Sequence, residues 1–374
     1  MILPPLRNAR NPTKKLFEVF SSIYITLSSI LAVFIEIEII RLKINGAEGI
    51  LGILLHLHRI CLQVSTAVIS MRTTFFIREQ YDAFLTKLWK VNPKISWLKS
   101  TDLSKIISPY VLFVIISILY NGYVTSSISG FNYYALYLLG AFQSLQGSIV
   151  LAVEISLVRF MRFQFSAITD ELLEHQSREK RENCNELNVI EIEIKTPNRS
   201  RNIQELIFCH DKVCNLVDNF NSIFGIHSLL TLFLCFIGIL IQAGFFFARV
   251  FDGSLNEVEE WSVIIMLSYY TIKFTMFPVV LAHECSCVVA EGKKLVATCF
   301  SCSSRLPLMR KTYEEELFEK CLTLLCRQAE TRMPQFSAGG FFTIDYSMLA
   351  SMAGCLTANM IIILQFIQSN RNGA

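Results

Sequence analysis

Charged side chains are scarce in this chain of 374 residues, at 17% of the total, whereas hydrophobic residues make up 52%. The mean hydropathy is +0.45, which excludes an ordinary soluble domain. The sequence also lacks GxSxG, HExxH and Walker A motifs and has no paired aspartates in its apolar runs, which argues against an enzyme. We therefore expect a non-enzymatic membrane protein without a cofactor.

Seven apolar runs are long enough to cross about 30 Å of hydrocarbon as helices. They are Leu16–Ile40, Ile50–Met71, Pro109–Ile128, Tyr133–Val158, Ile223–Ala248, Trp261–Ala282 and Phe341–Phe366. Of the 34 lysines and arginines, 28 lie in the N-terminal segment and in residues 72–108, 159–221 and 283–338. Under the positive-inside rule these segments are cytoplasmic. We predict an all-α polytopic protein with seven transmembrane helices, a cytoplasmic N-terminus and an extracellular C-terminus.

None of the 12 cysteines lies in a predicted exterior loop, so no disulfide framework is expected. Five residues near the sixth run have roughly the spacing of metal ligands: His283, Cys285, Cys287, Cys299 and Cys302. Reduced cytosolic thiols explain them equally well, and we predict no metal site. The net charge of +3 follows from the topology and needs no nucleic-acid partner.

The predicted interior segments carry apolar stripes at helical spacing. These stripes are Ile77, Tyr81, Phe84, Leu85 and Leu88; Leu206, Cys209, Val213, Leu216, Val217 and Phe220; and Leu317, Cys321, Leu324 and Leu325. They indicate that spanning helices project into the cytoplasm and pack together, although helices lying flat on the membrane have the same pattern. Residues 178–197 have no sustained apolar face and are predicted to form a mobile linker.

Polar side chains in membrane spans usually face water, a partner or a ligand, because an unpaired polar group is costly there. The predicted orientation places many of them in the outer half of the first six helices. The candidate ligand-binding residues are His56, Arg59, Tyr120, Asn121, Tyr137, Gln143, Gln242, Tyr269, Tyr270 and Lys273. Aromatic walls with a few convergent donors suit a small organic ligand. The alternative is hydrogen bonding between helices, with Arg59 or Lys273 paired to Glu36 or Glu38.

The last apolar run sorts its side chains by size along one face. Six residues fall within a sector about 80° wide at 100° per residue. They are Ser347, Ser351, Gly354, Ala358, Ile362 and Gln365. Small residues of this kind are typical of a close-packing seam. The change to Ile362 and then Gln365 favours a pore instead, in which Ile362 forms a hydrophobic constriction in a symmetric oligomer.

This last helix resembles the signature of the insect gustatory receptors, a family of seven-helix chemoreceptors. That family ends its final helix with Thr-Tyr, five hydrophobic residues and Gln-Phe, and residues 360–366 match the last seven positions. Ala358-Asn359 replaces the usual Thr-Tyr. The segment from Gly340 to Asp345 is similar to the family's approach to this helix.

The resemblance implies a ligand-gated, non-selective cation channel opened by a small-molecule tastant. The implied assembly is a homotetramer, or a mixed tetramer with related receptors, in the lipid of the plasma membrane. Residues 1–338 would hold the ligand, and the helix in residues 339–374 would line the pore, with Ile362, Gln365, Phe366, Ala358 and Gly354 at the gate. A metabotropic seven-helix receptor and a small-molecule transporter are the alternative interpretations.

Overall fold

A computed structural model describes residues 12–72, 75, 77–90, 112–123, 131–185, 198–252, 257–304 and 313–372, except 45–49, 113–114, 117–118 and 121. The helices are α1 (Pro12–Ile44), α2 (Ile50–Met71), α3 (Arg78–Lys90), α5 (Phe131–Asn185), α6 (Asn198–Asp252), α7 (Glu257–Ser303), α8 (Tyr313–Thr331) and α9 (Tyr346–Asn372). A two-stranded antiparallel hairpin, β1 (Ser337–Ala338) and β2 (Phe342–Thr343), precedes α9. The described chain is therefore almost entirely helical, as predicted.

Three of the described segments are long and apolar enough to cross a membrane: Ser200–Phe247, Leu267–Ser303 and Tyr346–Gln365. They contain most of the fifth, sixth and seventh predicted spans. The second predicted span coincides with α2, and the first and fourth lie within α1 and α5. The third is helical at its described positions between 112 and 123.

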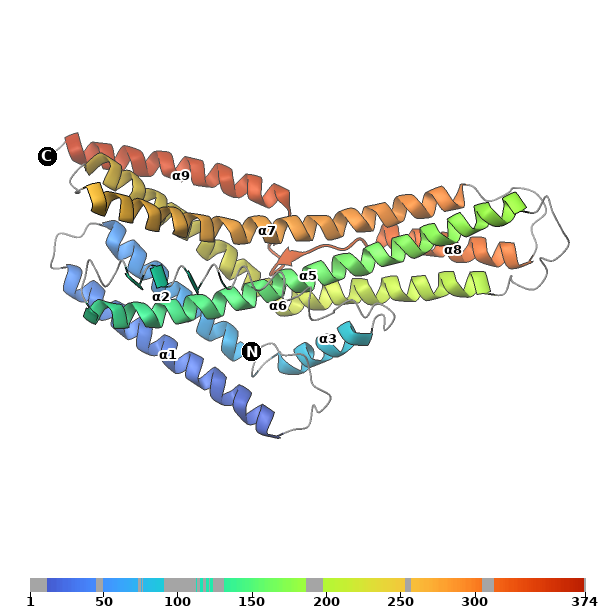
Figure 1. The fold of residues 1–374 in the computed structure, drawn as a ribbon, viewed down its shortest axis with the longest axis horizontal. Coiled ribbons are helices and arrows are strands. Elements are labelled where there is room, and N and C mark those ends of the chain that lie inside the picture. Colours follow the sequence, from blue (N-terminus) through green and yellow to red (C-terminus); the bar gives the residue numbers. More distant parts are fainter. Residues whose placement is uncertain are drawn as a thin grey trace.

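The helices α5, α6 and α7 form the long axis of the molecule (Figure 1). The longest two contain 55 residues each, or about 80 Å at 1.5 Å per residue, far more than a bilayer core requires. In Figure 1, α1, α2 and α9 lie along one half of this axis and α8 along the other. The predicted projection of spanning helices beyond the membrane region is thus present in the fold.

The projecting halves pack around one apolar core. Leu206, Val213 and Phe220 from the predicted stripe of α6 are buried there. Phe84 of α3 and Leu325 of α8 join the same core, whereas Leu324 remains exposed. The interpretation of these segments as helices lying flat on a membrane is therefore wrong for α6 and α8, because their apolar faces are covered by other helices.

Two predicted boundaries are corrected. Residues 178–185 continue α5 as helix rather than linker, because Arg, Glu and Lys are strong helix formers even without an apolar face. The remainder of the predicted linker, residues 186–197, lies outside the described residues. The seventh predicted helix, α9, begins at Tyr346 and not at Phe341. Gly339 and Gly340 adopt positive φ angles of 60° and 81° and form the turn between β1 and β2.

Buried carboxylates join the three long helices near the predicted inner ends of their apolar runs. Glu154 of α5 is fully buried and pairs with His227 of α6. Glu284 of α7 is 2% exposed and accepts a hydrogen bond of 2.9 Å from Nε of Arg159 on α5. A buried charge is tolerated only with such partners, so these pairs fix how the helices are placed beside one another.

The hairpin before α9 lies directly on α6. A Cβ atom added to Gly225 of α6 would stand 3.0 Å from the backbone nitrogen of Gly339 and 3.2 Å from the carbonyl oxygen of Ser337. Backbone atoms cannot move aside as a flexible side chain does. Gly225 therefore permits a close backbone contact between α6 and the segment that leads into α9.

We expect Gly225→Ala to destabilise the protein by about 1–3 kcal/mol, because the added methyl group overpacks a backbone contact. Gly354→Ala in α9 is the matched control, since a Cβ there meets nothing within 4 Å among the described atoms. It should leave stability unchanged or raise it by up to about 1 kcal/mol, the difference in helix propensity. Thermal unfolding of the purified protein in detergent measures both, and equal melting temperatures would contradict the close contact.

Candidate functional site

One face of α2 is turned toward α1, and it carries two of the predicted ligand residues. Nδ1 of His56 lies 2.5 Å from Oε2 of Glu36, and Nη1 of Arg59 lies 3.6 Å from Oε1 of the same carboxylate. His56 and Glu36 are buried, whereas the side chain of Arg59 is 43% exposed. For Arg59 the structure contains the ion pair with Glu36 that the sequence offered as an alternative. The two basic side chains share a face, as predicted.

The other face of α2 meets an aromatic group on α7. His58 Nε2 lies 3.0 Å from the carbonyl oxygen of Leu234 on α6, and its ring meets Phe274 edge-on with centroids 5.4 Å apart. Tyr270 stacks on Phe274 at 6.3 Å, and Tyr269 lies 5.3 Å from Tyr270. We call His58, Phe274, Tyr269 and Tyr270 the aromatic cluster. It connects α2 to α7 beside α6.

A glycine makes room for this cluster. A Cβ atom added to Gly238 of α6 would lie 2.9 Å from the ring of Phe274, so any other residue here would force the ring away from the helix. Sequence reasoning missed both Phe274 and Gly238, because a phenylalanine and a glycine in an apolar run have no distinguishing signal. The spacing of four residues from Tyr270 to Phe274 is the one pattern that would have placed the phenylalanine on the tyrosine's face.

The remaining predicted ligand residues are only partly gathered. Lys273 is half-buried one turn from the two tyrosines, and Gln242 is buried on α6 one turn beyond Gly238. Tyr120 is exposed. Asn121 and the side chains of Tyr137 and Gln143 lie outside the described residues. The described residues of the predicted pocket thus include a charged face toward α1 and part of the aromatic cluster toward α7.

The helix α9 has two faces of opposite character. Its packed face consists of Met348, Met352, Leu356, Met360 and Ile363, which are buried or half-buried. Its open face carries all six residues of the predicted stripe, and each of them is exposed. Ile362 is 61% exposed, and the side chain of Phe366 lies outside the described residues. Since a Cβ at Gly354 meets nothing described within 4 Å, the stripe is not a packing seam within this chain.

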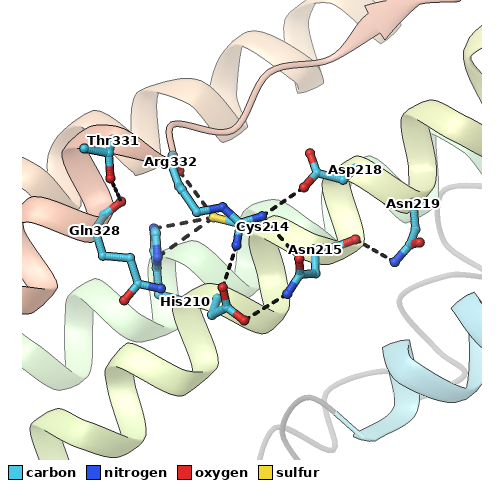
Figure 2. Close-up of polar contacts among 9 residues, drawn as sticks. His210, Cys214, Asn215, Asp218, Asn219, Gln328, Thr331 and Arg332 are labelled. Atoms are coloured by element: carbon cyan, nitrogen blue, oxygen red, sulfur yellow. Dashed lines mark hydrogen bonds and ion pairs between the residues drawn. The ribbon is translucent and has the colours of Figure 1, made fainter.

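The segment leading into α9 is held along one line of α6. Arg332 follows α8 and reaches Asp211 at 2.5 Å and Asp218 at 2.9 Å, as Figure 2 shows for its contact with Asp218. One turn further along, Asn221 donates to the carbonyl oxygen of Gln335 at 2.7 Å and accepts from the backbone N–H of Ser337 at 3.1 Å. These bonds and the contact at Gly225 fix the base of α9 to α6.

The first turn of α9 is capped by an aspartate. Asp345 accepts hydrogen bonds from the Ser347 hydroxyl at 2.6 Å and from the backbone N–H of Met348 at 3.0 Å. These donors, Ser347 first, hold the pKa of the Asp345 carboxyl below its ordinary value. Tyr346 beside it hydrogen-bonds His283 of α7 at 2.7 Å. The start of α9 is therefore tied to α6 and α7, and its open face extends from Ser347 to Gln365.

Comparison with known proteins decides the family. Residues 5–370 match the family model described as 7tm chemosensory receptor. The chain belongs to that family. Two Drosophila melanogaster proteins are similar to this receptor: Gustatory receptor 68a, 26% identical over 172 residues, and Putative gustatory receptor 28b, 21% identical over 181. The matched segments cover 45% and 48% of this chain and 41% and 37% of those relatives.

The fold of the receptor is also that of solved chemoreceptors. The olfactory receptor OR5 of Machilis hrabei in complex with eugenol superimposes with a TM-score of 0.67 at 14% identity, covering 98% of this chain and 93% of that one. A second structure of OR5 gives a TM-score of 0.64 at 12% identity over the same shares. The resemblance to insect chemoreceptors that rested on residues 360–366 is confirmed.

The cap of α9 is testable by substitution. We expect Asp345→Ala to destabilise the receptor by about 1 kcal/mol, because the N–H of Met348 loses its acceptor. Asp345→Asn, which keeps an acceptor oxygen, should cost less. Since the folded-state pKa is depressed, the charged cap stabilises the protein above the unfolded pKa, and this contribution is lost as pH falls below about 4. Thermal unfolding at neutral pH compares the variants, and an equal loss in both would contradict a capping role.

Proposed function

We propose that this receptor is a subunit of a ligand-gated cation channel in the plasma membrane, opened by a small-molecule tastant. Four copies of α9 surround a pore along the symmetry axis. The N-terminus is cytoplasmic and the C-terminus extracellular. The tastant occupies the outer half of the helix bundle and favours the state in which the α9 helices spread, since a ligand shifts an equilibrium only by binding one state more tightly.

The open face of α9 is the observation that carries this proposal. A membrane helix with one packed face and one exposed face of small residues followed by Ile362 and Gln365 has a surface that the described part of its own chain does not cover. Serines leave room for water at the inner end. A ring of Ile362 side chains closes a narrow pore by excluding water, and amides at Gln365 lie beside it.

The ligand region is supported by the two groups around α2. The charged face of Glu36, His56 and Arg59 supplies donors, and the aromatic cluster supplies apolar walls; each is a feature of sites for small organic molecules. OR5, which shares the fold, is a receptor whose structure holds eugenol. Tyr269, Tyr270 and Phe274 of the aromatic cluster lie on α7, and His283 of the same helix bonds Tyr346 of α9. One helix therefore connects the ligand region to the pore helix.

The proposal predicts a cation current that needs no G protein. The receptor expressed in cells with G-protein signalling blocked should still give tastant-evoked currents in whole-cell recordings. Cells transfected with an empty vector are the control. A response that disappears under the block would favour a metabotropic receptor, and saturable uptake without conductance would favour a transporter.

Ile362→Ala should raise the ligand-free current several-fold, because shortening the side chain widens and wets the hydrophobic constriction. Ile363→Ala is the matched control: the same change is made one residue along, on the packed face, and it should leave the ligand-free current unchanged. Single-channel and whole-cell recordings measure both after surface expression has been equalised. Identical currents in the wild type and in Ile362→Ala would refute the assignment of Ile362 as the gate.

A further inference from the structure

Gln63 of α2 is a buried amide whose oxygen has no hydrogen-bond partner among the described residues. Its side chain is 4% exposed, and its Oε1 atom accepts no hydrogen bond from the described residues. An unpaired amide oxygen in a low-dielectric interior costs about 1–3 kcal/mol. None of the hydrogen bonds and ion pairs described above involves Oε1 of Gln63. A group from outside the chain that donates a hydrogen bond would satisfy it.

Gln63 belongs to the charged face of α2. It follows Arg59 by four residues and His56 by seven, so the three side chains lie on one face of the helix. Arg59 is half exposed and Gln63 buried, which makes the arginine end of this face the accessible one. The contact of Arg59 with Glu36, at 3.6 Å, is longer than a hydrogen bond. The guanidinium therefore keeps N–H groups with which it can donate to a ligand oxygen.

The charge on this face is already balanced. The Glu36 carboxylate offsets the Arg59 guanidinium, so an ammonium or carboxylate ligand would bring a third charge next to a satisfied pair inside the membrane, where an extra charge is costly. A neutral ligand avoids this cost. A hydroxyl group is the simplest neutral group that both accepts a hydrogen bond from a guanidinium and donates one to an amide oxygen.

We propose that the Arg59–Gln63 face of α2 binds the hydroxyl group of a small neutral ligand, with the hydroxyl hydrogen donated to Oε1 of Gln63. This inference rests on the proposed function and deepens it by naming the ligand class. The ligands are alcohols, phenols or sugars, and not amines or carboxylic acids.

Matched compounds on expressed receptors test the ligand class. We would record currents with 2-phenylethanol, 4-methylphenol and glucose, each beside its O-methylated counterpart, and with 2-phenylethylamine and phenylacetate as charged analogues. The effective concentration of an active hydroxyl compound should be at least about 10-fold lower than that of its methyl ether, the effect of one buried hydrogen bond. In Gln63→Met, which keeps the length of the side chain but removes the acceptor, this difference should fall to within about 3-fold.

Stability supplies a measurement that needs no ligand. Asn221→Leu removes an amide whose oxygen and nitrogen are both bonded, and it should lower the melting temperature by at least about 2 °C. Gln63→Met should not lower it, because the amide oxygen that it removes is unpaired. A fall as large as that of Asn221→Leu would show that Gln63 is paired within the fold and would overturn the proposal.

The possible results separate this inference from the proposed function. Equal potency of hydroxyl compounds and ethers, an unchanged difference in Gln63→Met, or stronger currents with the charged analogues would overturn the assignment of Gln63 while leaving the channel intact. Silence toward all hydroxyl compounds, with an open Ile362→Ala channel, would overturn the ligand class alone. Silence in both the wild type and Ile362→Ala would instead count against the channel itself.

Discussion

A carboxylate buried among helices must be paired, and this requirement governs how α5, α6 and α7 are arranged. Glu154 and Glu284 are both nearly inaccessible, and their partners come from neighbouring helices. Removing one partner of such a pair costs about 3–5 kcal/mol, so sliding any of the three helices past another is strongly opposed. The pairs lie where the predicted membrane spans end, and they join the membrane half of the molecule to the projecting half as one body.

Against this body, α9 is tied at its start by polar and backbone contacts and is covered along one face only. Its base is held by Arg332, Asn221 and the backbone contact at Gly225, and its packed face follows the core through Met348 and Met352. Beyond these residues the packed face is half-buried as far as Ile363. An element that is firmly anchored at its start and less covered toward its end is suited to bending outward without unfolding its base. The Asp345 cap, bonded to the first turn, keeps that turn helical.

The sequence predicted the helices better than their junctions. The apolar run predicted both the first and the last residue of α2, because the free energy of transferring such a run into hydrocarbon outweighs the helix propensities of single residues. Residues 341–345 were assigned to the last helix because Phe341, Phe342 and Ile344 extend its apolar run, but the two glycines with positive φ and the aspartate cap decide the local structure. The Arg59–Glu36 pair was foreseen as one of several pairings. The aromatic cluster was not, since it depends on Gly238 admitting the Phe274 ring, a steric fact between two helices that no single-helix pattern contains.

The Glu36–Arg59 pair also affects how α1 and α2 are inserted into the membrane. A charge at the centre of a membrane helix raises the insertion free energy by about 2.5–3.5 kcal/mol. Arg59 lies near the middle of α2, and its partner Glu36 lies toward the far end of the apolar run in α1. The two helices are consecutive, α1 ending at Ile44 and α2 beginning at Ile50, and their charges meet across the hairpin. Insertion as a helical hairpin lets each charge enter the bilayer already neutralised, whereas stepwise insertion exposes both to lipid. We therefore expect α1 and α2 to leave the translocon together.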